Sequence, residues 1–385
     1  MTEADDNKLI AERRARLAVL RRQGEAFPNT FRRDSQAGEL QQRFGALERE
    51  ALEQEDRRFA VSGRLMARRG PFLVLQDGSG QIQLYVDRKV LPVELQEAIR
   101  HWDIGDIVGA RGPLRKSGKG SLYVAIEQAQ LLTKSLRPLP EKYHGLSDQE
   151  LRYRQRYVDL IVNERTRETF RIRSATIDHI RRFFNAHGFL EVETPMMQPI
   201  PGGAVARPFV THHNALDMPL YLRIAPELYL KRLVVGGLER VYEINRNFRN
   251  EGLSTRHNPE FTMLEFYWAY ADYRDLMDLT ETLLRDLVSA VLGTTRVEYQ
   301  GTTLDFGAPF ERLTLAEAVL RHNPQISPAE LADPVAARAH AERLGAAVPD
   351  GSGPGGVQLA LFEETVEPRL QRPTFITAFP IEVSP

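Results

Sequence analysis

A change in the spacing of apolar residues divides this chain and limits the folds that it can adopt. Over residues 58–133 the apolar side chains form short alternating runs between turn residues, whereas residues 5–24 and 166–186 repeat them with helical spacing. A repeat of two is typical of strands with one buried face, and a repeat near 3.6 of amphipathic helices. We therefore predict an α+β chain in which a β part precedes a mixed part.

The β part is predicted to contain five strands and one helix. The turn Asp77-Gly78-Ser79-Gly80 joins the second strand to the third, because glycine accepts positive φ there. Five strands with one helix between the third and the fourth are the arrangement of the OB-fold, a small β-barrel. The first strand begins at residue 58, the others are expected over 72–76, 82–86, 106–112 and 122–132, and the helix over 91–102.

Proline and glycine residues indicate the boundaries of the mixed part. Residues 136–140 form a proline-containing, stiff linker, and the helix over 166–186 is expected to end at Gly188. A short strand over 190–193 follows, then strands over 211–270 with one helix at 226–235. The predicted divisions are a helical extension (1–57), the barrel (58–135), a linker (136–160) and a final domain (161–385), whose mainly helical segment 313–370 contains a flexible loop at 351–356.

Composition excludes some classes of protein. The chain contains no cysteine, which excludes disulfides and thiolate metal sites. No apolar run approaches the roughly 20 residues of a membrane-spanning helix, and no secretory leader is recognisable, so we expect a cytoplasmic protein without membrane contact. A net charge of −1 gives no overall sign of nucleic-acid binding. Local basic clusters nevertheless favour a phosphate-binding surface: Arg13, Arg14, Arg16, Arg21 and Arg22; Arg64, Arg68 and Arg69; Arg115, Lys116 and Lys119.

Three short motifs lack residues that their chemistry requires. Residues 116–121 contain Gly-Lys-Gly rather than the Gly-Lys-Ser or Gly-Lys-Thr that ends a phosphate loop. The turn through Gly78 and Gly80 lacks the third glycine of a dinucleotide site. His212-His213 has neither a cysteine nor a His-x-x-x-His pattern near it. We assign no metal ligands in this chain.

The residues suited to chemistry are concentrated in two predicted strands, 239–251 and 261–268. Arginine binds phosphate or carboxylate through planar bidentate hydrogen bonds, and an aromatic face can stack on a base. The common face of the two strands is therefore suited to a nucleotide and a cationic small molecule, although cross-strand ion pairs on an exposed hairpin would give the same pattern. Read with a period of two, that face contains Glu243, Asn245, Asn247, Arg249, Glu251, Phe261, Glu265 and Tyr267.

These strands resemble part of a known family. Phe248-Arg-Asn-Glu251, the loop with His257, and Phe261 match motif 2 of the class II aminoacyl-tRNA synthetases. Residues 188–195 (Gly-Phe-Leu-Glu-Val-Glu-Thr-Pro), after a long helix, match motif 1, which builds the dimer interface in that family. The bacterial-type lysine–tRNA ligases are resembled in particular by Pro201-Gly-Gly-Ala204, by residues 225–231 (Ala-Pro-Glu-Leu-Tyr-Leu-Lys) and by the strand through Glu265 and Tyr267.

The resemblance implies how ATP would be bound. Arg249 would be the catalytic residue, since its counterpart holds both the α-phosphate of ATP and the carboxylate of the amino acid. Phe261 would stack on adenine, and Glu251 and His257 would lie in the loop over the nucleotide.

The resemblance also implies a lysine site. Glu227 would accept the α-ammonium group, and Gly203 would let the backbone approach it. Glu265 and Tyr267 would face the ε-ammonium group, and Arg249 the carboxylate. A buried ammonium without a carboxylate costs several kcal/mol, so an acidic residue here would admit lysine and reject uncharged isosteres.

The implied reaction has two steps and a nucleic-acid partner. The carboxylate of lysine would attack the α-phosphorus of ATP and expel pyrophosphate, and the lysyl group would then pass to the 3′ end of tRNA(Lys). In the barrel, Phe72 would stack on an anticodon base, Gln83 would read a base edge and Arg64 would contact the same loop. The family also implies a homodimer, with Pro195 at its interface.

The family's pattern is incomplete in this sequence. The carboxylates that hold Mg²⁺, a second acidic residue beside the ε-ammonium group and motif 3 have no match before Pro385. We therefore expect a truncated chain with little or no ligase activity, which normal pyrophosphate exchange would contradict. Mg²⁺ is expected without assigned ligands.

Two other functions fit part of the pattern. Aspartate and asparagine ligases share the barrel and the class II motifs, but Glu265 would repel an aspartate side chain. A non-catalytic tRNA-binding or regulatory fragment would need none of the lysine contacts.

Overall fold

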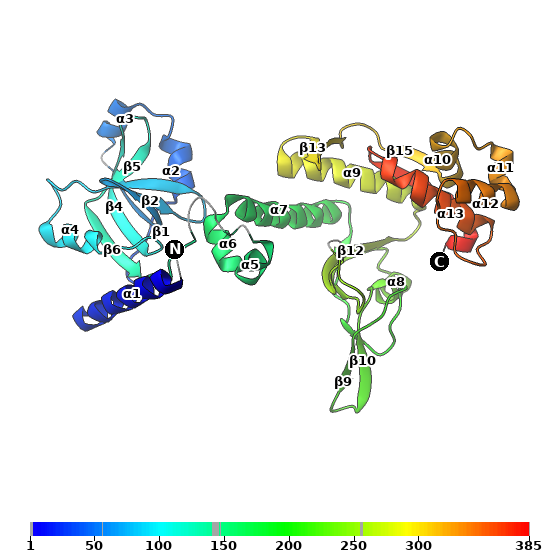
Figure 1. Cartoon of the computed structure of the whole chain (residues 1–385), viewed down its shortest axis with the longest axis horizontal. Coiled ribbons are helices and arrows are strands. Elements are labelled where there is room, and N and C mark those ends of the chain that lie inside the picture. The colour runs from blue at the N-terminus through cyan, green and yellow to red at the C-terminus, as the bar shows by residue number, and fades with distance from the viewer. Residues whose placement is uncertain (1–2, 56, 141–145, 147, 255–256, 385) are drawn as a thin grey trace. The chain divides into compact units, whose positions relative to one another are not determined.

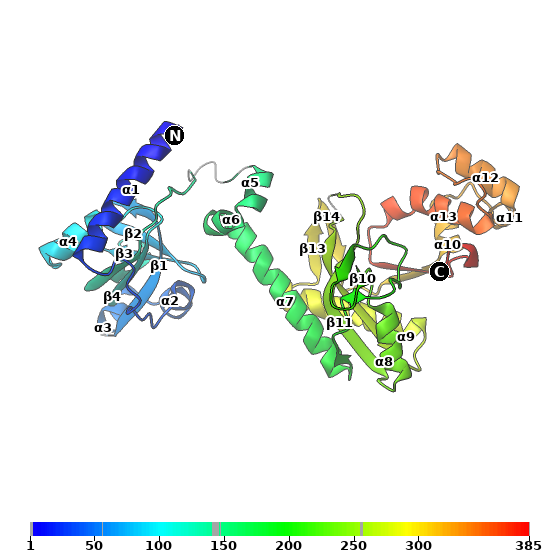
Figure 2. The ribbon, with the colours of Figure 1, turned by 90° about the horizontal axis from the view of Figure 1, so that it is seen from below.

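The computed structural model describes residues 3–55, 57–140, 146, 148–254 and 257–384 (Figures 1 and 2). Its contacts form two compact units, Met1–Thr166 and Arg167–Pro385. Residues 141–145 and 147 of the predicted linker lie outside the described residues.

The first unit is built around a closed β-barrel. Its strands follow the order β1-β2-β3-β5-β4-β6, and β1 also pairs with β4, which closes the sheet. Strands β3 and β5 are parallel, and the inward side chains form one apolar core that includes Phe59, Leu84 and Val124. The predicted OB-fold is confirmed, with strands β1 (Arg58–Arg69), β2 (Phe72–Gln76), β3 (Gln81–Tyr85), β4 (Ile107–Lys116), β5 (Leu122–Ala125) and β6 (Gln128–Thr133).

Two predicted strand limits in the barrel were wrong. Strand β4 continues to Lys116 instead of ending at Gly112, because Gly112 lets another strand approach: a Cβ atom there would lie 1.7 Å from the carbonyl oxygen of Ala125. The predicted strand over 122–132 is two strands, since β5 pairs with β3 and the end of β4, whereas β6 pairs with the beginning of β4. Apolar alternation does not reveal such a change of partner.

Helices surround the barrel. The predicted N-terminal helix is confirmed as α1 (Glu3–Gln23), and the helix predicted over 91–102 is the shorter α4 (Val93–Arg100). Helices α2 (Ala37–Phe44) and α3 (Arg49–Gln54) were not predicted individually, and their Leu40 and Leu52 side chains join the barrel core. Helices α5 (Gln149–Arg154) and α6 (Arg156–Val162) complete the unit.

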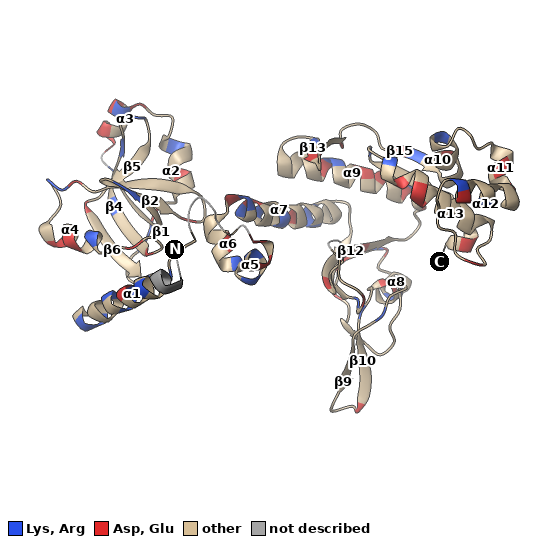
Figure 3. Cartoon of the chain, viewed as in Figure 1, with Lys and Arg blue, Asp and Glu red and all other residues tan. Residues whose placement is uncertain are grey.

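Many arginines of the predicted basic clusters bond to the protein itself. Arg13 donates to the carbonyl oxygens of Ser135 and Arg137, and Arg68 to those of Ile99 and Trp102. Arg115 likewise donates to the Leu52 and Leu114 carbonyls. Residues 13–22 of α1 include five arginines and no acidic residue, whereas both signs of charge occur along α7 and α9 (Figure 3). The phosphate-binding surface stays a prediction.

A buried ion cluster joins the segment after α4 to the end of β6. The Lys134 ammonium, with 1% of its side chain exposed, lies 2.7 Å from Asp106 Oδ2 and 2.5 Å from Asp103 Oδ2. Arg16 of α1 reaches Asp103 Oδ1 at 2.6 Å. The cluster therefore fixes α1 to the barrel through charge-assisted hydrogen bonds.

The long helix α7 (Glu164–Ala186) confirms the predicted helix before motif 1, and its end is capped as expected. Gly188 has φ +76°, and the backbone N–H of Phe189 donates to the Phe184 carbonyl at 3.0 Å. This is a Schellman cap, and the Phe184 and Phe189 rings, 5.0 Å apart, make the apolar contact that accompanies it. The cap turns the chain directly into β7 (Leu190–Glu191), which is shorter than the predicted strand.

The second unit contains two small sheets next to α8 (Glu227–Val235), which confirms the helix predicted at 226–235. One has the order β12-β11-β7, with β11 (Arg240–Phe248) and β12 (Glu260–Trp268) antiparallel. The other has the order β8-β10-β9, in which β9 (Val210–His213) and β10 (Met218–Leu222) form an extended hairpin (Figure 1) next to β8 (Met197–Gln198). The helix α9 (Tyr273–Leu292), which follows β12, was not predicted.

The segment predicted as mainly helical is confirmed, with one correction. The predicted loop 351–356 ends early because Pro354 begins α13, and Glu382 accepts a hydrogen bond from the Gly355 N–H at 2.9 Å in the first turn. The elements are β13 (Arg296–Tyr299), β14 (Thr302–Asp305), β15 (Glu311–Thr314), α10 (Leu315–His322), α11 (Pro328–Ala332), α12 (Pro334–Arg343), α13 (Pro354–Thr365), η1 (Glu367–Arg369), β16 (Thr374–Thr377) and η2 (Ile381–Val383). No described helix is long and apolar enough to cross a membrane.

Candidate functional site

The β11–β12 hairpin places the predicted site residues in register. Glu243 pairs with Glu265, Asn247 with Phe261, and Val241 with Tyr267. Tyr242 and its partner Phe266 belong instead to the core that packs against α7 and α9. The predicted separation of a polar face from an apolar face therefore agrees with the observed register.

The acidic end of the hairpin consists of Glu227, Glu243, Glu265 and Tyr267. The Tyr267 hydroxyl donates to Glu265 Oε1 at 2.8 Å. Burial raises the pKa of Glu265, and the nearby Glu227 and Glu243 carboxylates raise it further, against the hydrogen bond from Tyr267. Burial and the Glu265 carboxylate also raise the pKa of Tyr267, so this hydroxyl keeps its proton. Lys231 lies beside Glu227 and Arg223 beside Glu243, whereas Glu265 has no ion-pair partner among the residues that the structure describes.

Glu227 begins α8 and connects the acidic end to the Gly203 loop. Its Oε1 atom lies 2.5 Å from Lys231 Nζ, one helical turn further on. Gly203 has φ +87°, and a Cβ atom there would lie 2.8 Å from the Glu227 Cβ atom. Only glycine allows this approach without strain, so the structure brings Gly203 and Glu227 together as the sequence predicts.

The guanidinium end consists of Arg249 and Phe261. Arg249 follows the last residue of β11, and its N–H still bonds to the Pro259 carbonyl at 2.8 Å. The Arg249 guanidinium lies 5.3 Å from the centre of the Phe261 ring. Its Nε atom is buried and has no hydrogen-bond partner among the residues that the structure describes, as is true of Asn247 Oδ1. Such buried polar atoms are usually satisfied, so a ligand is expected here.

Glu251 and His257 lie in the loop between β11 and β12. Glu251 Oε1 accepts a hydrogen bond from the Arg207 N–H at 3.4 Å, which links the loop to the chain after Gly203. His257 Nδ1 lies 2.8 Å from Ser254 Oγ. Residues 255 and 256 between them lie outside the described residues.

Sequence reasoning missed a buried ion pair behind the acidic end. Arg223 Nη1 lies 2.7 Å from Glu243 Oε1, and the two side chains are 0% and 1% exposed. Thr194 Oγ1 also donates to Glu243, at 2.6 Å. One signal could have identified Arg223: it is a single charge within the otherwise apolar run 220–226.

The barrel presents an aromatic cluster on its outer face. Phe72 lies 5.0 Å from Tyr85 and 5.5 Å from Tyr123, measured between ring centres. Gln83 is in register with Tyr123, so the structure brings Phe72 and Gln83 to the same surface. Arg64 donates to the Gly105 carbonyl at 2.7 Å, and burial lowers the pKa of its guanidinium.

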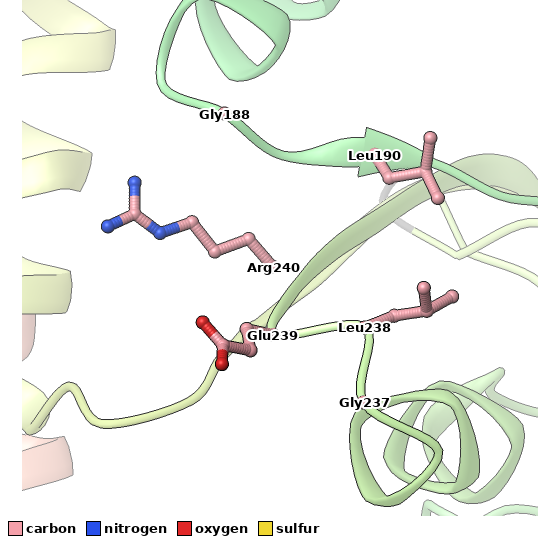
Figure 4. Close-up of a pocket in the computed structure, with 6 residues that line it drawn as sticks. All are labelled: Gly188, Leu190, Gly237, Leu238, Glu239 and Arg240. Carbon is pink, nitrogen blue, oxygen red and sulfur yellow. The ribbon is translucent and has the colours of Figure 1, made fainter.

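Pro195 lies between β7 and β8, where its carbonyl accepts a hydrogen bond from Gln198 Nε2 at 3.1 Å. An open pocket of about 440 Å³ lies at the other end of β7 (Figure 4). It lies beside the apolar side chains Leu190 and Leu238, and its described lining contains no predicted site residue: Gly188, Leu190, Gly237, Leu238, Glu239 and Arg240.

The residues that the structure describes contain no group of three or more His, Cys, Asp or Glu side chains arranged to hold a metal ion. His212 Nε2 faces Asp217 at 3.2 Å in the β9–β10 hairpin.

Comparison with known proteins gives two family matches. Residues 148–385 match the family described as tRNA synthetases class II (D, K and N), and residues 59–132 match the OB-fold nucleic acid binding domain. The chain is 63% identical to a lysine–tRNA ligase of Chromohalobacter salexigens, over 99% of this chain and 77% of that protein. It is 62% identical to one of Ectopseudomonas mendocina, over 99% and 75%, and 61% identical to one of Thioalkalivibrio sulfidiphilus, over 99% and 77%.

Proposed function

The chain belongs to the class II tRNA synthetases of the aspartate, lysine and asparagine group, and we propose that it uses ATP to attach L-lysine to tRNA(Lys). Membership makes it an aminoacyl-tRNA synthetase with ATP as substrate. The choice of lysine is supported most by the acidic end of the hairpin, where Glu227, Glu265 and Tyr267 meet.

The amino acid would be held by its two ammonium groups and its carboxylate. Glu227, which the Gly203 backbone approaches closely, accepts the α-ammonium group. Glu265 accepts the ε-ammonium group while Tyr267 holds the Glu265 carboxylate in place. A neutral or acidic side chain would leave Glu265 without a cation, which is costly in a buried position.

Arg249 would join the two substrates. Its guanidinium, fixed beside the Phe261 ring, binds the α-phosphate and the lysine carboxylate, while Phe261 stacks on adenine. Glu251 and His257 cover the nucleotide from the loop. The lysine carboxylate then attacks the α-phosphorus, the bond to pyrophosphate breaks, and a hydroxyl of the tRNA 3′ end later displaces AMP from the lysyl carbonyl. The first nucleophile is already an anion, so positioning and cationic stabilisation suffice.

Thermal unfolding of residues 1–385 with added ligands tests this assignment. A lysyl-adenylate analogue should raise the melting temperature more than L-lysine or ATP alone, since it occupies both ends of the hairpin. L-aspartate and L-asparagine should have no effect. A chain that binds tRNA(Lys) but responds to none of the small molecules would be a non-catalytic RNA-binding protein instead.

The barrel would bind the anticodon of the tRNA through Phe72 and Gln83, and Arg64 would contact the same anticodon loop. Phe72→Ala should weaken binding of the tRNA(Lys) anticodon stem-loop by about 1–3 kcal/mol, because a stacked base is lost. Fluorescence anisotropy at several salt concentrations measures this, and the salt dependence should stay unchanged because no phosphate contact is removed. Tyr299→Ala, an exposed aromatic in the second unit, is the control. An altered salt slope with unchanged affinity would contradict stacking.

The remaining parts of the proposal rest on the family. We propose a homodimer through the motif 1 region around Pro195, where Leu190 is 52% exposed, Mg²⁺ as the companion of ATP, and action in the cytoplasm. We also propose four divisions of the chain: a helical extension (1–57), the barrel (58–135), a linker (136–160) and the catalytic domain (161–385).

A further inference from the structure

Three carboxylates gather at the acidic end of the hairpin, although lysine has only two ammonium groups. Glu243 and Glu265 are cross-strand partners, so their side chains leave neighbouring points of the same face. Glu227 and Glu243 both act on the Glu265 carboxyl electrostatically, as does the guanidinium of Arg223 with the opposite sign. The charges of these four side chains, and that of Lys231, which pairs with Glu227, therefore have to be considered together.

Arg223 and Glu243 neutralise each other inside the protein. Besides the bond of Arg223 Nη1 to Glu243, that atom donates to Thr194 Oγ1 at 3.0 Å and to the Thr194 carbonyl at 3.3 Å, and Nε donates to the Arg246 carbonyl at 2.9 Å. Glu243 also accepts from the Thr194 N–H at 3.2 Å and from Asn245 Nδ2 at 3.1 Å. A buried pair of this kind is often no more stable than apolar residues of similar size, so stability alone gives no reason for it.

One atom of the pair is left without a partner. Arg223 Nη2 is fully buried and forms no hydrogen bond within the described part of the chain. A buried guanidinium N–H that lacks an acceptor is costly unless a ligand or water supplies one. The unsatisfied donor therefore indicates that the pair borders a place that ligand or solvent fills.

We propose that Arg223 is a positioning residue for lysine: by neutralising Glu243 it leaves Glu265 without a like charge opposite it, so that the Glu265 carboxylate can bind the ε-ammonium group. Glu227, which pairs with Lys231 at 2.5 Å, would accept the α-ammonium group. The inference rests on the proposed function and extends it to residues that do not touch the reacting atoms. Without Arg223, Glu243 and Glu265 would face each other as like charges, and one of them would take up a proton.

The variant Arg223→Gln tests the inference by calorimetric titration with L-lysine between pH 6 and pH 8. Loss of the guanidinium should raise the pKa of the carboxyls beside it, so the site is partly protonated at neutral pH. Lysine affinity at pH 7 should then fall by about ten-fold or more and recover as the pH rises, since only the ionised carboxylate binds an ammonium group. The parent chain should show the smaller pH dependence over this range.

A double variant separates charge from structure. Arg223→Gln with Glu243→Gln removes both charges of the pair, so Glu265 again has no like charge opposite it. Affinity should therefore return to within about three-fold of the parent, and the added pH dependence should disappear. Arg312→Gln, which breaks ion pairs with Asp278 and Glu281 elsewhere in the second unit, is the control for a lost ion pair. It should leave lysine binding and its pH dependence unchanged.

The possible results are distinct. An unchanged affinity and pH dependence in Arg223→Gln would overturn the inference. So would a double variant that melts like the parent chain yet binds lysine as weakly as the single variant, because the role would then be geometric. If the parent chain itself released no heat with L-lysine, the proposed function would be overturned, and this inference with it.

Discussion

Glu265→Gln is expected to weaken L-lysine binding by about thirty-fold or more, which corresponds to about 2–5 kcal/mol for one partner of a buried, hydrogen-bonded charge pair. The amide has almost the shape of the carboxylate and can still accept the hydrogen bond from Tyr267, so the change removes charge rather than packing. The ε-ammonium group would then be buried without a counter-charge. Calorimetric titration with L-lysine measures the loss directly.

The pH dependence provides a second test of Glu265. Burial, together with Glu227 and Glu243, raises the pKa of this carboxyl above its ordinary value. Lysine affinity of the parent chain should therefore decrease as the pH falls through the raised pKa, at a higher pH than an exposed glutamate would require. Glu265→Gln should lack that decrease, because no titrating group remains at this position.

A matched change on the same strand gives the control. Glu260 begins β12 and faces Arg246 at 3.4 Å, with about half of each side chain exposed to solvent. Exposed pairs of this kind contribute at most about 1 kcal/mol, so Glu260→Gln should leave lysine binding almost unchanged. Equal lysine affinities in Glu265→Gln and the parent chain would contradict the lysine assignment and would favour a related ligase.

The sequence predicted the hairpin well because its information is local. Both strands lie within residues 239–268 and are joined by one loop. A period of two therefore assigns each side chain to a face without knowledge of the rest of the fold. The same holds for the cap at Gly188, where one residue with positive φ determines how α7 ends. Such features need only neighbouring residues to be interpreted.

What the sequence did not predict depends on contacts between distant segments. Arg223 and Thr194 become part of the site only because the chain before α8 runs beside β11, where the Phe248 N–H bonds to the Arg223 carbonyl at 2.9 Å. Gly112 was predicted to end a strand, whereas in the structure it lies inside β4 and makes room for the backbone of Ala125. In both cases the structural role of the residue depends on a contact with a distant segment, which the neighbouring residues do not reveal.

Lys134→Met should produce the largest loss of stability, about 3–5 kcal/mol in the free energy of unfolding of the barrel. The substitution keeps a long side chain but leaves Asp106, which is 0% exposed, without its cation. Asp103 keeps two ion-pair partners, Arg16 at 2.6 Å and Arg13 at 4.0 Å. The rest of the Asp106 carboxylate is already used, since it accepts from the N–H groups of Asp103 and Ser135, both at 2.8 Å. Urea unfolding followed through Trp102, in a Trp268→Phe background, measures the barrel alone.

The loss of stability caused by Lys134→Met should itself depend on pH. Burial alone would raise the pKa of Asp103, but hydrogen bonds from Lys134 and Arg16 outweigh it and lower the pKa below 3.8. In the parent, the stability gained from ionised Asp103 is therefore present above pH 3.8 and is lost as the pH falls through the lowered pKa. In the variant an ionised Asp103 lacks its main cation, so lowering the pH should reduce the difference in the free energy of unfolding between the two chains.

The control is Arg100→Met, which removes an exposed ion pair with Glu97 and should cost about 0.5 kcal/mol or less. A loss of similar size in Lys134→Met would show that the buried cluster contributes no more than a surface pair.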